Sequence, residues 1–450
     1  MDGSASNGRE LVTGDIGKTL VRFALPFVFA NLLQVFYGAA DMIIVGRFCD
    51  AASVAAVGVG SQIMMFEITL LFGLSAGGTV IIGQRWGAED SAGVRRIIGT
   101  MSVLFPLAGL VMTGVLVAFA DDFVVLMMTP QEAVEHTRRY VLVCSLALVF
   151  VASYNVIASA LRGLGDSKTP LRFIIFGGLV NVAADFLLVG VFGMGVYGAA
   201  LATSAAQALS VVYAVFYLKG HGIACGFHVR DVAFSGSEAS AVVRMGAPIA
   251  LQNCLIDLSF LVITAIVNSM GLIASAGLGV AERLIGFAML APGSLAAAVA
   301  TMTSQNIGAG FPERAKGCFR SGVLFSLFFG AAFCIYCQFA PSSLTMVFSS
   351  DQAVVAAAAD YLRSFSIDCV FVCYVFNANA FFSGCGHTVF PMIHSVASTF
   401  LLRVPVSYLL SRREEATLFD VGFAAPAASL LSIVMCFFYY RSGRWKRPVL

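Results

Sequence analysis

Acidic side chains occur inside long apolar stretches of this chain, where little water is available to stabilise a charge. Asp41 lies within QVFYGAADMIIVG (residues 34–46), preceded by Gln34 and Tyr37, and Asp185 follows Asn181 in NVAADFLLVG. Residues three, four or seven positions apart share one face of a helix, so Gln34, Tyr37 and Asp41 share a face. A carboxylate at this depth in an apolar stretch costs several kcal/mol and indicates a functional site.

The acidic pair suggests ion coupling. Counted along the helices, Asp41, Asp185 and Thr203 are expected at one level in the outer half of a membrane, with Asn181 one turn below Asp185. Two close carboxylates in a low dielectric cannot both stay charged, and a proton or a hard cation such as Na⁺ relieves their repulsion. Hard cations prefer oxygen ligands, so we predict a Na⁺ or H⁺ site at Asp41, Asn181, Asp185 and Thr203. Asn181 and Thr203, taken alone, fit ordinary helix contacts better.

A second acidic pair lies in the C-terminal half of the chain. Asp257 and Asp368 are candidates for the substrate cavity or for a second ion site near the midplane. The alternative is a structural pair with Arg283 or Arg363, and the sequence leaves both open. Arg403, just before a proline, is a further buried cation that could pair across helices.

Composition indicates the elements that position these residues. Hydrophobic residues make up 59% of the 450 positions and charged residues 12%, with a net charge of +2. Soluble domains carry about 25% charged residues, so we expect an all-α integral membrane protein. We predict twelve transmembrane helices, at 20–45, 52–80, 94–119, 134–160, 171–192, 196–218, 240–268, 273–303, 319–340, 353–382, 389–410 and 421–440.

The chain also repeats itself. RFALPFVFANLL (22–33) aligns with RMGAPIALQNCL (244–255), and GLGDSKTP (163–170) aligns with GCGHTVFP (384–391). Two six-helix lobes entering the membrane in the same direction give a parallel pseudo-twofold repeat. We expect an N-terminal lobe at 1–218, a cytoplasmic linker at 219–239 and a C-terminal lobe at 240–450. The acids Asp41 and Asp185 align with apolar Ile263 and Val406, so the lobes share a scaffold but not their chemistry.

Basic residues predict the orientation. Lys and Arg gather in both tails and after the even-numbered helices, whereas the other loops mix a few arginines with many acids. Cytoplasmic loops carry the excess of Lys and Arg, so both termini should be cytoplasmic in a multi-pass protein of the cell membrane.

Several motifs resemble those of the MATE family, the multidrug and toxic compound extrusion transporters. They are ALPFVFANLLQVFYGAADMIIVG, GQRWGAED, and RGLGDSKTP with the Asn181 and Asp185 that follow. The resemblance covers the whole chain and extends to the bacterial NorM, DinF and MepA-like branch. It implies two six-helix lobes that export lipophilic, cationic compounds in exchange for Na⁺ or H⁺.

The resemblance also implies residue roles. It implies that the cation site of the N-terminal lobe is formed by Asp41, Asn181, Asp185 and Thr203. It also implies that Tyr37 and Tyr140 lie near this site. Some members use acids in helices 7 and 10 instead, close to Asp257 and Asp368. Pro26 would be a hinge in helix 1, since a proline inside a helix removes one hydrogen bond.

We therefore expect a secondary-active multidrug antiporter rather than an enzyme. No Walker motif and no catalytic constellation is present, and no cofactor is expected beyond the coupling ion. The expected partners are small organic molecules and the lipid bilayer, with no nucleic acid, and the expected state is a monomer. The alternative is a flippase for lipid-linked oligosaccharides, which the buried acids disfavour and the three arginines keep open.

Overall fold

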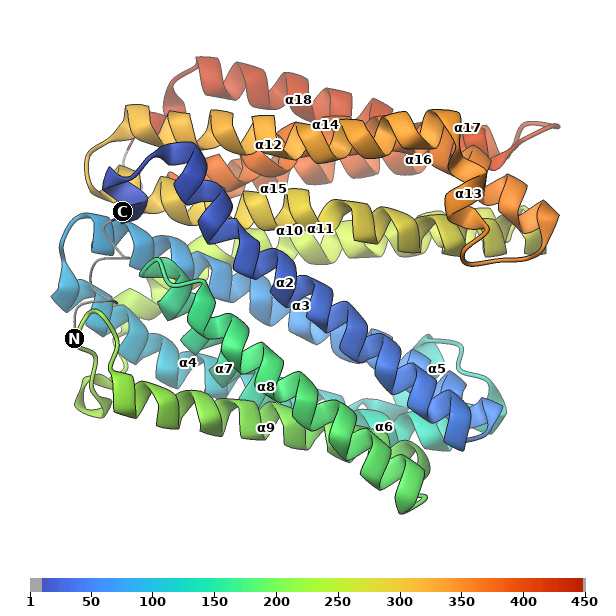
Figure 1. The fold of residues 1–450 in the computed structure, drawn as a ribbon, viewed down its shortest axis with the longest axis horizontal. Helices are drawn as coiled ribbons and strands as arrows, with labels where there is room; N and C mark the ends of the chain where they lie inside the picture. The colour runs from blue at the N-terminus through green and yellow to red at the C-terminus, as the bar shows by residue number, and fades with distance from the viewer. Residues whose placement is uncertain (1–9, 448–450) are drawn as a thin grey trace. The chain divides into compact units, whose positions relative to one another are not determined.

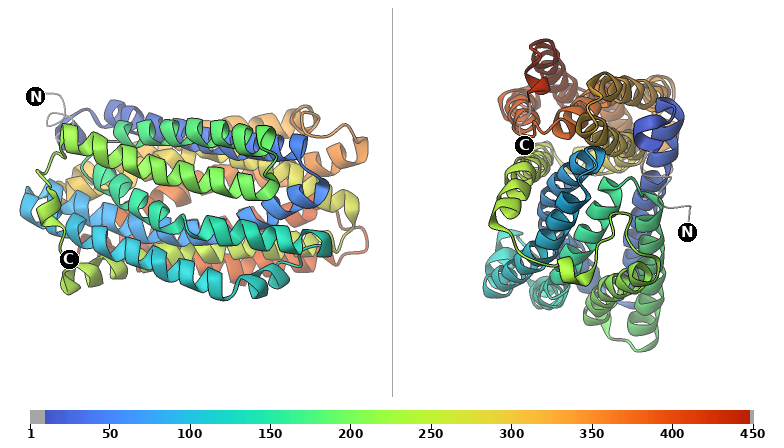
Figure 2. Two further views of the ribbon diagram at one scale, coloured as in Figure 1. Left: turned by 90° about the horizontal axis from the view of Figure 1, so that it is seen from below. Right: turned by 90° about the vertical axis from the view of Figure 1, so that its left-hand side faces the viewer.

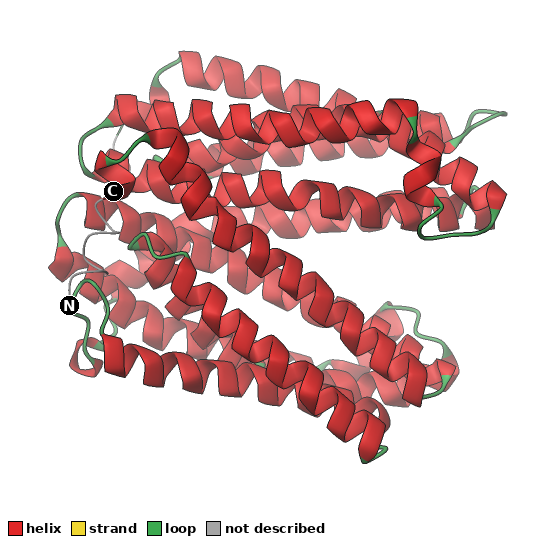
Figure 3. Cartoon of the chain, viewed as in Figure 1, coloured by secondary structure: helices red, strands yellow, loops and turns green. Residues whose placement is uncertain are grey.

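The computed structural model describes residues 10–447, and these form helices joined by short loops, without strands (Figure 3). The first part of the chain holds α2 (Ile16–Phe48), α3 (Ala51–Gly87), α4 (Ser91–Ala118), α5 (Ala120–Leu126), η1 (Gln131–Ala133), α6 (Val134–Ser145), α7 (Leu148–Gly163), α8 (Lys168–Asp185), the π-helix η2 (Phe186–Val191), α9 (Gly195–His221) and η3 (Val229–Asp231). Successive elements are coloured in chain order in Figure 1.

The second part of the chain has the same kind of elements. It holds α10 (Gly236–Asn268), α11 (Leu272–Gly308), α12 (Pro312–Phe339), α13 (Pro341–Thr345), α14 (Gln352–Gly384), α15 (Val389–Ser398), the π-helix η4 (Thr399–Arg403), α16 (Val404–Ser411), α17 (Leu418–Gly422), α18 (Ala424–Arg441) and η5 (Arg444–Lys446).

The predicted membrane spans are confirmed. Eleven helices of the described chain are long and apolar enough to cross a bilayer, and α6 with α7 makes a twelfth if the bent pair is one span. This pair meets at 45°, so the predicted span at 134–160 is broken near Ala147. No proline causes the break; the Ala147 N–H instead bonds the Cys144 carbonyl, a tighter turn than the α-helical one.

The helices gather into two compact units, each with its own core. One unit contains Leu25–Ala250, and the other contains Leu11–Ala24 and the chain from Leu251 onward. Both unit boundaries therefore fall within helices, in α2 just before Pro26 and in α10 just after Pro248. Both helices continue through their prolines, and the lobe boundaries expected from the sequence remain a prediction.

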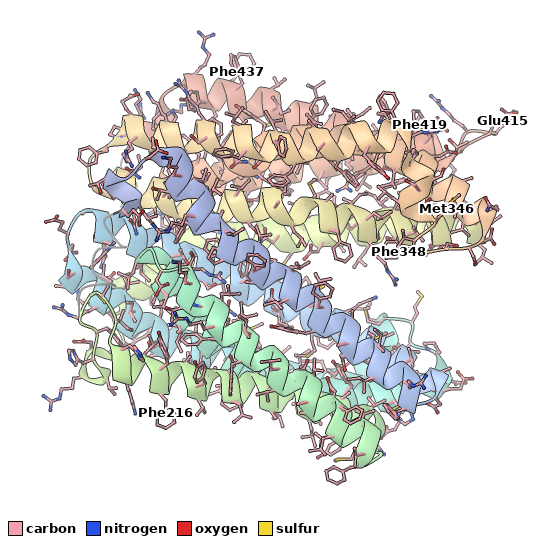
Figure 4. The ribbon with its side chains drawn as sticks, viewed as in Figure 1. Phe216, Met346, Phe348, Glu415, Phe419 and Phe437 are labelled. Carbon is pink, nitrogen blue, oxygen red and sulfur yellow. The ribbon has the colours of Figure 1, made fainter. Side chains whose placement is uncertain are left out.

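Each unit is apolar inside and also over much of its outside. The first unit packs α3, α4, α6 and α7 around buried aliphatic residues such as Leu71, Ile97 and Leu148. Large apolar side chains also project outward, including Phe216 of α9 and Phe437 of α18 (Figure 4). This distribution suits helices that face lipid. The views in Figure 2 show that α8 and α9 run side by side, as their contacts confirm.

Candidate functional site: an acidic pair in the first unit

Asp41 and Asp185 lie close enough to interact electrostatically in the first unit. Asp41 is on α2 with 9% of its surface exposed, and Asp185 ends α8 with none exposed. Oδ1 of Asp41 and both carboxylate oxygens of Asp185 are buried and have no hydrogen-bond partner. Buried polar atoms are almost always satisfied in proteins, so these oxygens mark a place where a proton or cation would bind.

The end of α8 positions Asp185. After Asp185 the backbone changes from an α-helix to the π-helix η2. Single π turns inside helices are rare and occur frequently at functional sites, because the extra residue rotates the side chains that follow. The π turn therefore determines how η2 is rotated relative to α8, and this change begins directly after Asp185.

Helix α6 contributes Tyr140, which the family resemblance placed near the site, and Cys144, which the sequence did not single out. Tyr140 interacts electrostatically with Asp41, and Cys144, one turn further, does so with both acids. The hydroxyls of Tyr140 and Ser61 share a hydrogen bond of 3.2 Å. A Cβ on Gly60 would lie 2.4 Å from the Tyr140 ring, so the missing side chain at Gly60 makes room for it. For Cys144 the only signal in the sequence is its position one turn after Tyr140 on the same helix face.

Asn181 and Thr203, the other two residues of the predicted ion site, form no hydrogen bond with Asp41 or Asp185 in the described part of the chain. Both are half-buried, and Nδ2 of Asn181 is buried without a hydrogen-bond partner. Their predicted role as ligands thus remains a prediction.

Tyr37 and Gln34, which precede Asp41 on α2, lie in different surroundings. The Tyr37 hydroxyl donates a 2.8 Å hydrogen bond to the Ile174 carbonyl on α8, and the ring lies where a Cβ on Gly178 would be. Gln34 is exposed. Tyr37 therefore joins α2 to α8 beside the acidic pair, whereas nothing ties Gln34 to the carboxylates.

The ligand chemistry of the pair fits a proton or Na⁺. The carboxylates of Asp41 and Asp185 offer oxygen ligands, which suit a hard cation. Within residues 10–447, no group of three or more His, Cys, Asp or Glu side chains could hold a metal ion. A transition-metal centre therefore has no support in this part of the chain.

The second unit has its own buried charges. Asp368 on α14 is 5% exposed and interacts electrostatically with Arg403, whereas Asp257 on α10 is half-buried. Arg363 contacts Asp360 at 3.7 Å on the surface. The cation beside Asp368 is thus Arg403, rather than Arg363 or Arg283 as we had considered.

Comparison with known proteins decides the family. The model of the MatE family matches residues 26–187 and again residues 248–409. The chain belongs to the MatE family. The double match also confirms the duplication, because each end of the second range lies 222 residues after the matching end of the first.

Relatives of this MATE transporter are described as drug exporters. "Probable multidrug resistance protein YpnP" of Bacillus subtilis is 29% identical, over 97% of each chain. "Multidrug export protein MepA" of Staphylococcus aureus is 23% identical, over 77% of this chain and 76% of that protein.

Solved structures agree on the fold. An outward-facing multidrug resistance MATE transporter matches with a TM-score of 0.90 and 22% identity, over 98% of this chain and 99% of that chain. A MATE crystal structure in a bent conformation matches with a TM-score of 0.91 and the same identity, over 98% of both chains. The MatE family match and the apolar spans, rather than these structures, make the protein a multi-pass membrane transporter and not an enzyme.

Proposed function

We propose that this MATE transporter exports small, lipophilic organic cations in exchange for Na⁺ or H⁺, with Asp41 and Asp185 as the coupling site. The observation that carries the proposal is a pair of buried carboxylates that interact electrostatically and include oxygens without hydrogen-bond partners. The names of the relatives, which are multidrug exporters, support the substrate class.

The electrostatics of the pair give coupling a physical basis. With both carboxylates ionised in a low dielectric, the like charges repel and the ion-bound form is favoured. Binding of a proton or Na⁺ from outside removes the repulsion, and its release on the other side restores it. An ion that binds one conformation better than the other shifts the equilibrium between them. Exchange follows if the substrate favours the opposite conformation and the site opens to alternate sides of the membrane.

We assign this conformational change to helix α2. It bears Asp41, and its residues before Leu25 belong to the other unit. Pro26 lies at this boundary and removes one backbone hydrogen bond, which lowers the cost of bending there. A related transporter has been solved in a bent conformation, which supports Pro26 as a hinge.

The test is efflux of an organic-cation dye from vesicles under separately imposed Na⁺ and pH gradients. Asp41→Asn should abolish gradient-driven efflux while the protein still reaches the membrane. Asp122→Asn, an exposed acid of α5, is the matched control and should leave efflux unchanged. Full coupled efflux by Asp41→Asn would remove this carboxylate from the mechanism.

The same assay addresses the flippase. No comparison favours a lipid-linked oligosaccharide as the substrate. Flipping of a lipid-linked precursor in proteoliposomes, without dye efflux under either gradient, would replace the proposed function with that alternative.

We also infer that the protein is a monomer of the cell membrane and that both of its termini are cytoplasmic. The orientation is supported by the basic residues of the tails and of the loops after even-numbered helices. Labelling of cysteines introduced next to each terminus, in intact cells and in opened cells, tests the orientation. Labelling from outside intact cells would contradict it.

A further inference from the structure

Arg403 is a buried cation in the second unit. It ends the π-helix η4 and has 9% of its surface exposed. The offset of 221 residues between the repeated GLGDSKTP and GCGHTVFP motifs pairs Arg403 with Val182 of the first unit. In both units the helix concerned changes into a π-helix near this position. The duplication therefore places a positive charge where the first unit has an apolar side chain.

Aromatic rings enclose the Arg403 guanidinium. Its central carbon lies 4.1 Å from the centre of the Phe260 ring and 5.8 Å from that of Phe365. Cations within about 6 Å of a ring centre are attracted to its π face, most strongly where water is excluded. The rings come from α10 and α14, so two helices besides η4 hold the guanidinium.

Two carboxylates complete the surroundings. Glu282 on α11 and Asp368 on α14 each interact electrostatically with Arg403, and so does the Tyr361 hydroxyl. No carboxylate in the described chain comes within 4.0 Å of Arg403, the limit for the ion pairs found elsewhere in the protein. Nε and Nη2 of Arg403, Oε1 of Glu282 and Oδ1 of Asp368 are buried without hydrogen-bond partners.

This geometry differs from that of a structural ion pair. A structural Arg–carboxylate pair is short and often bidentate. Here the guanidinium is held by ring faces, by a hydrogen bond to the Tyr361 hydroxyl and by carboxylates at longer range, as a bound organic cation would be. The surrounding charge is two carboxylates against one guanidinium, so the site attracts cations.

We propose that Phe260, Glu282, Phe365 and Asp368 form a binding site for a guanidinium cation, and that Arg403 fills this site as a tethered ligand. The tethered charge neutralises the acids of the second unit without a dissolved ion. A consequence, which rests on the proposed function, is that ion coupling is left to Asp41 and Asp185 in the first unit.

The test uses the full-length protein in detergent and needs no transport. Arg403→Ala should lower the thermal unfolding temperature by several degrees, because it leaves buried carboxylates without their cation. Millimolar methylguanidinium should restore much of the loss with saturable dependence, whereas methylammonium at equal ionic strength should restore little. Arg283→Ala, at an exposed arginine of the same lobe, should show no such rescue.

The absence of rescue in Arg403→Ala, or equal rescue by both cations, would overturn the proposal. If Arg403→Ala does not yield folded protein, Arg403→Met is compared with Arg403→Met/Asp368→Asn. The double variant should give several-fold more folded protein, since it removes one of the unpaired acids. Equal yields would refute the site. Failure of dye efflux in the earlier assay leaves these binding results unaffected.

Discussion

Replacing Gly178 with alanine tests how the structure places Tyr37 beside the acidic pair. A Cβ at this position of α8 would lie 1.9 Å from the Tyr37 ring, whereas ordinary van der Waals contact begins at 3.4 Å. The ring must therefore move by about 1.5 Å, which is the difference between these two distances. The 2.8 Å hydrogen bond from the Tyr37 hydroxyl to the Ile174 carbonyl cannot survive a movement of that size.

The expected cost follows from three effects. Overpacking of this kind costs about 1–3 kcal/mol, and the lost hydrogen bond about 1 kcal/mol. Alanine is favoured over glycine inside a helix by about 0.5–1 kcal/mol, which opposes them. We expect Gly178→Ala to lower the free energy of unfolding by about 2 kcal/mol, roughly a 30-fold change in the unfolding equilibrium constant.

The assay is denaturant unfolding in detergent, followed by tryptophan-independent probes such as circular dichroism. Gly38→Ala on α2 is the control: a Cβ there meets nothing within 4 Å, so it should be neutral or slightly stabilising. Gly178→Ala/Tyr37→Ala should be more stable than Tyr37→Ala, because the added methyl group then fills space that the ring has left. A Gly178→Ala variant as stable as the parent protein would refute the packing we describe.

Three further predictions concern other contacts of the first unit. Glu238→Gln should destabilise by about 1–3 kcal/mol in the same unfolding assay, because glutamine keeps only one of the two oxygens that accept from Arg85, at 2.9 and 2.8 Å, and has no negative charge; an unchanged midpoint would contradict this. Gly77→Ala should reduce folded yield sharply, since its Cβ would lie 2.4 Å from a backbone nitrogen of α10 that no side-chain truncation can move; normal yield would show that the helices separate easily. Hydrogen bonds from the Ser53 side chain and backbone lower the pKa of Asp50, the N-cap of α3. This cap should protect the amides in the first turn of α3 from hydrogen exchange above about pH 4, and the protection should be lost as the pH falls further. Exchange rates in Asp50→Ala equal to those of the parent protein would count against this role.

The sequence by itself determined the membrane class, the spans and the duplication. Hydropathy can be evaluated for each segment separately, because an apolar helix satisfies its backbone hydrogen bonds within itself in the bilayer. The buried state of Asp41 and Asp185 followed in the same way, from the apolar residues that flank each of them. These properties are local, so one chain without its fold suffices to predict them.

Only the tertiary structure decided which side chains meet. Each residue turns a helix by about 100°, so a small rotation of one helix selects a different neighbour on the next. Sequence spacing could not show that Tyr37 bonds to α8, that Tyr140 approaches Asp41, or that Asp368 lies beside Arg403 rather than Arg283. Those contacts depend on how the ridges of several helices pack and on the π turns that reset their direction, and no single stretch of the chain contains that information.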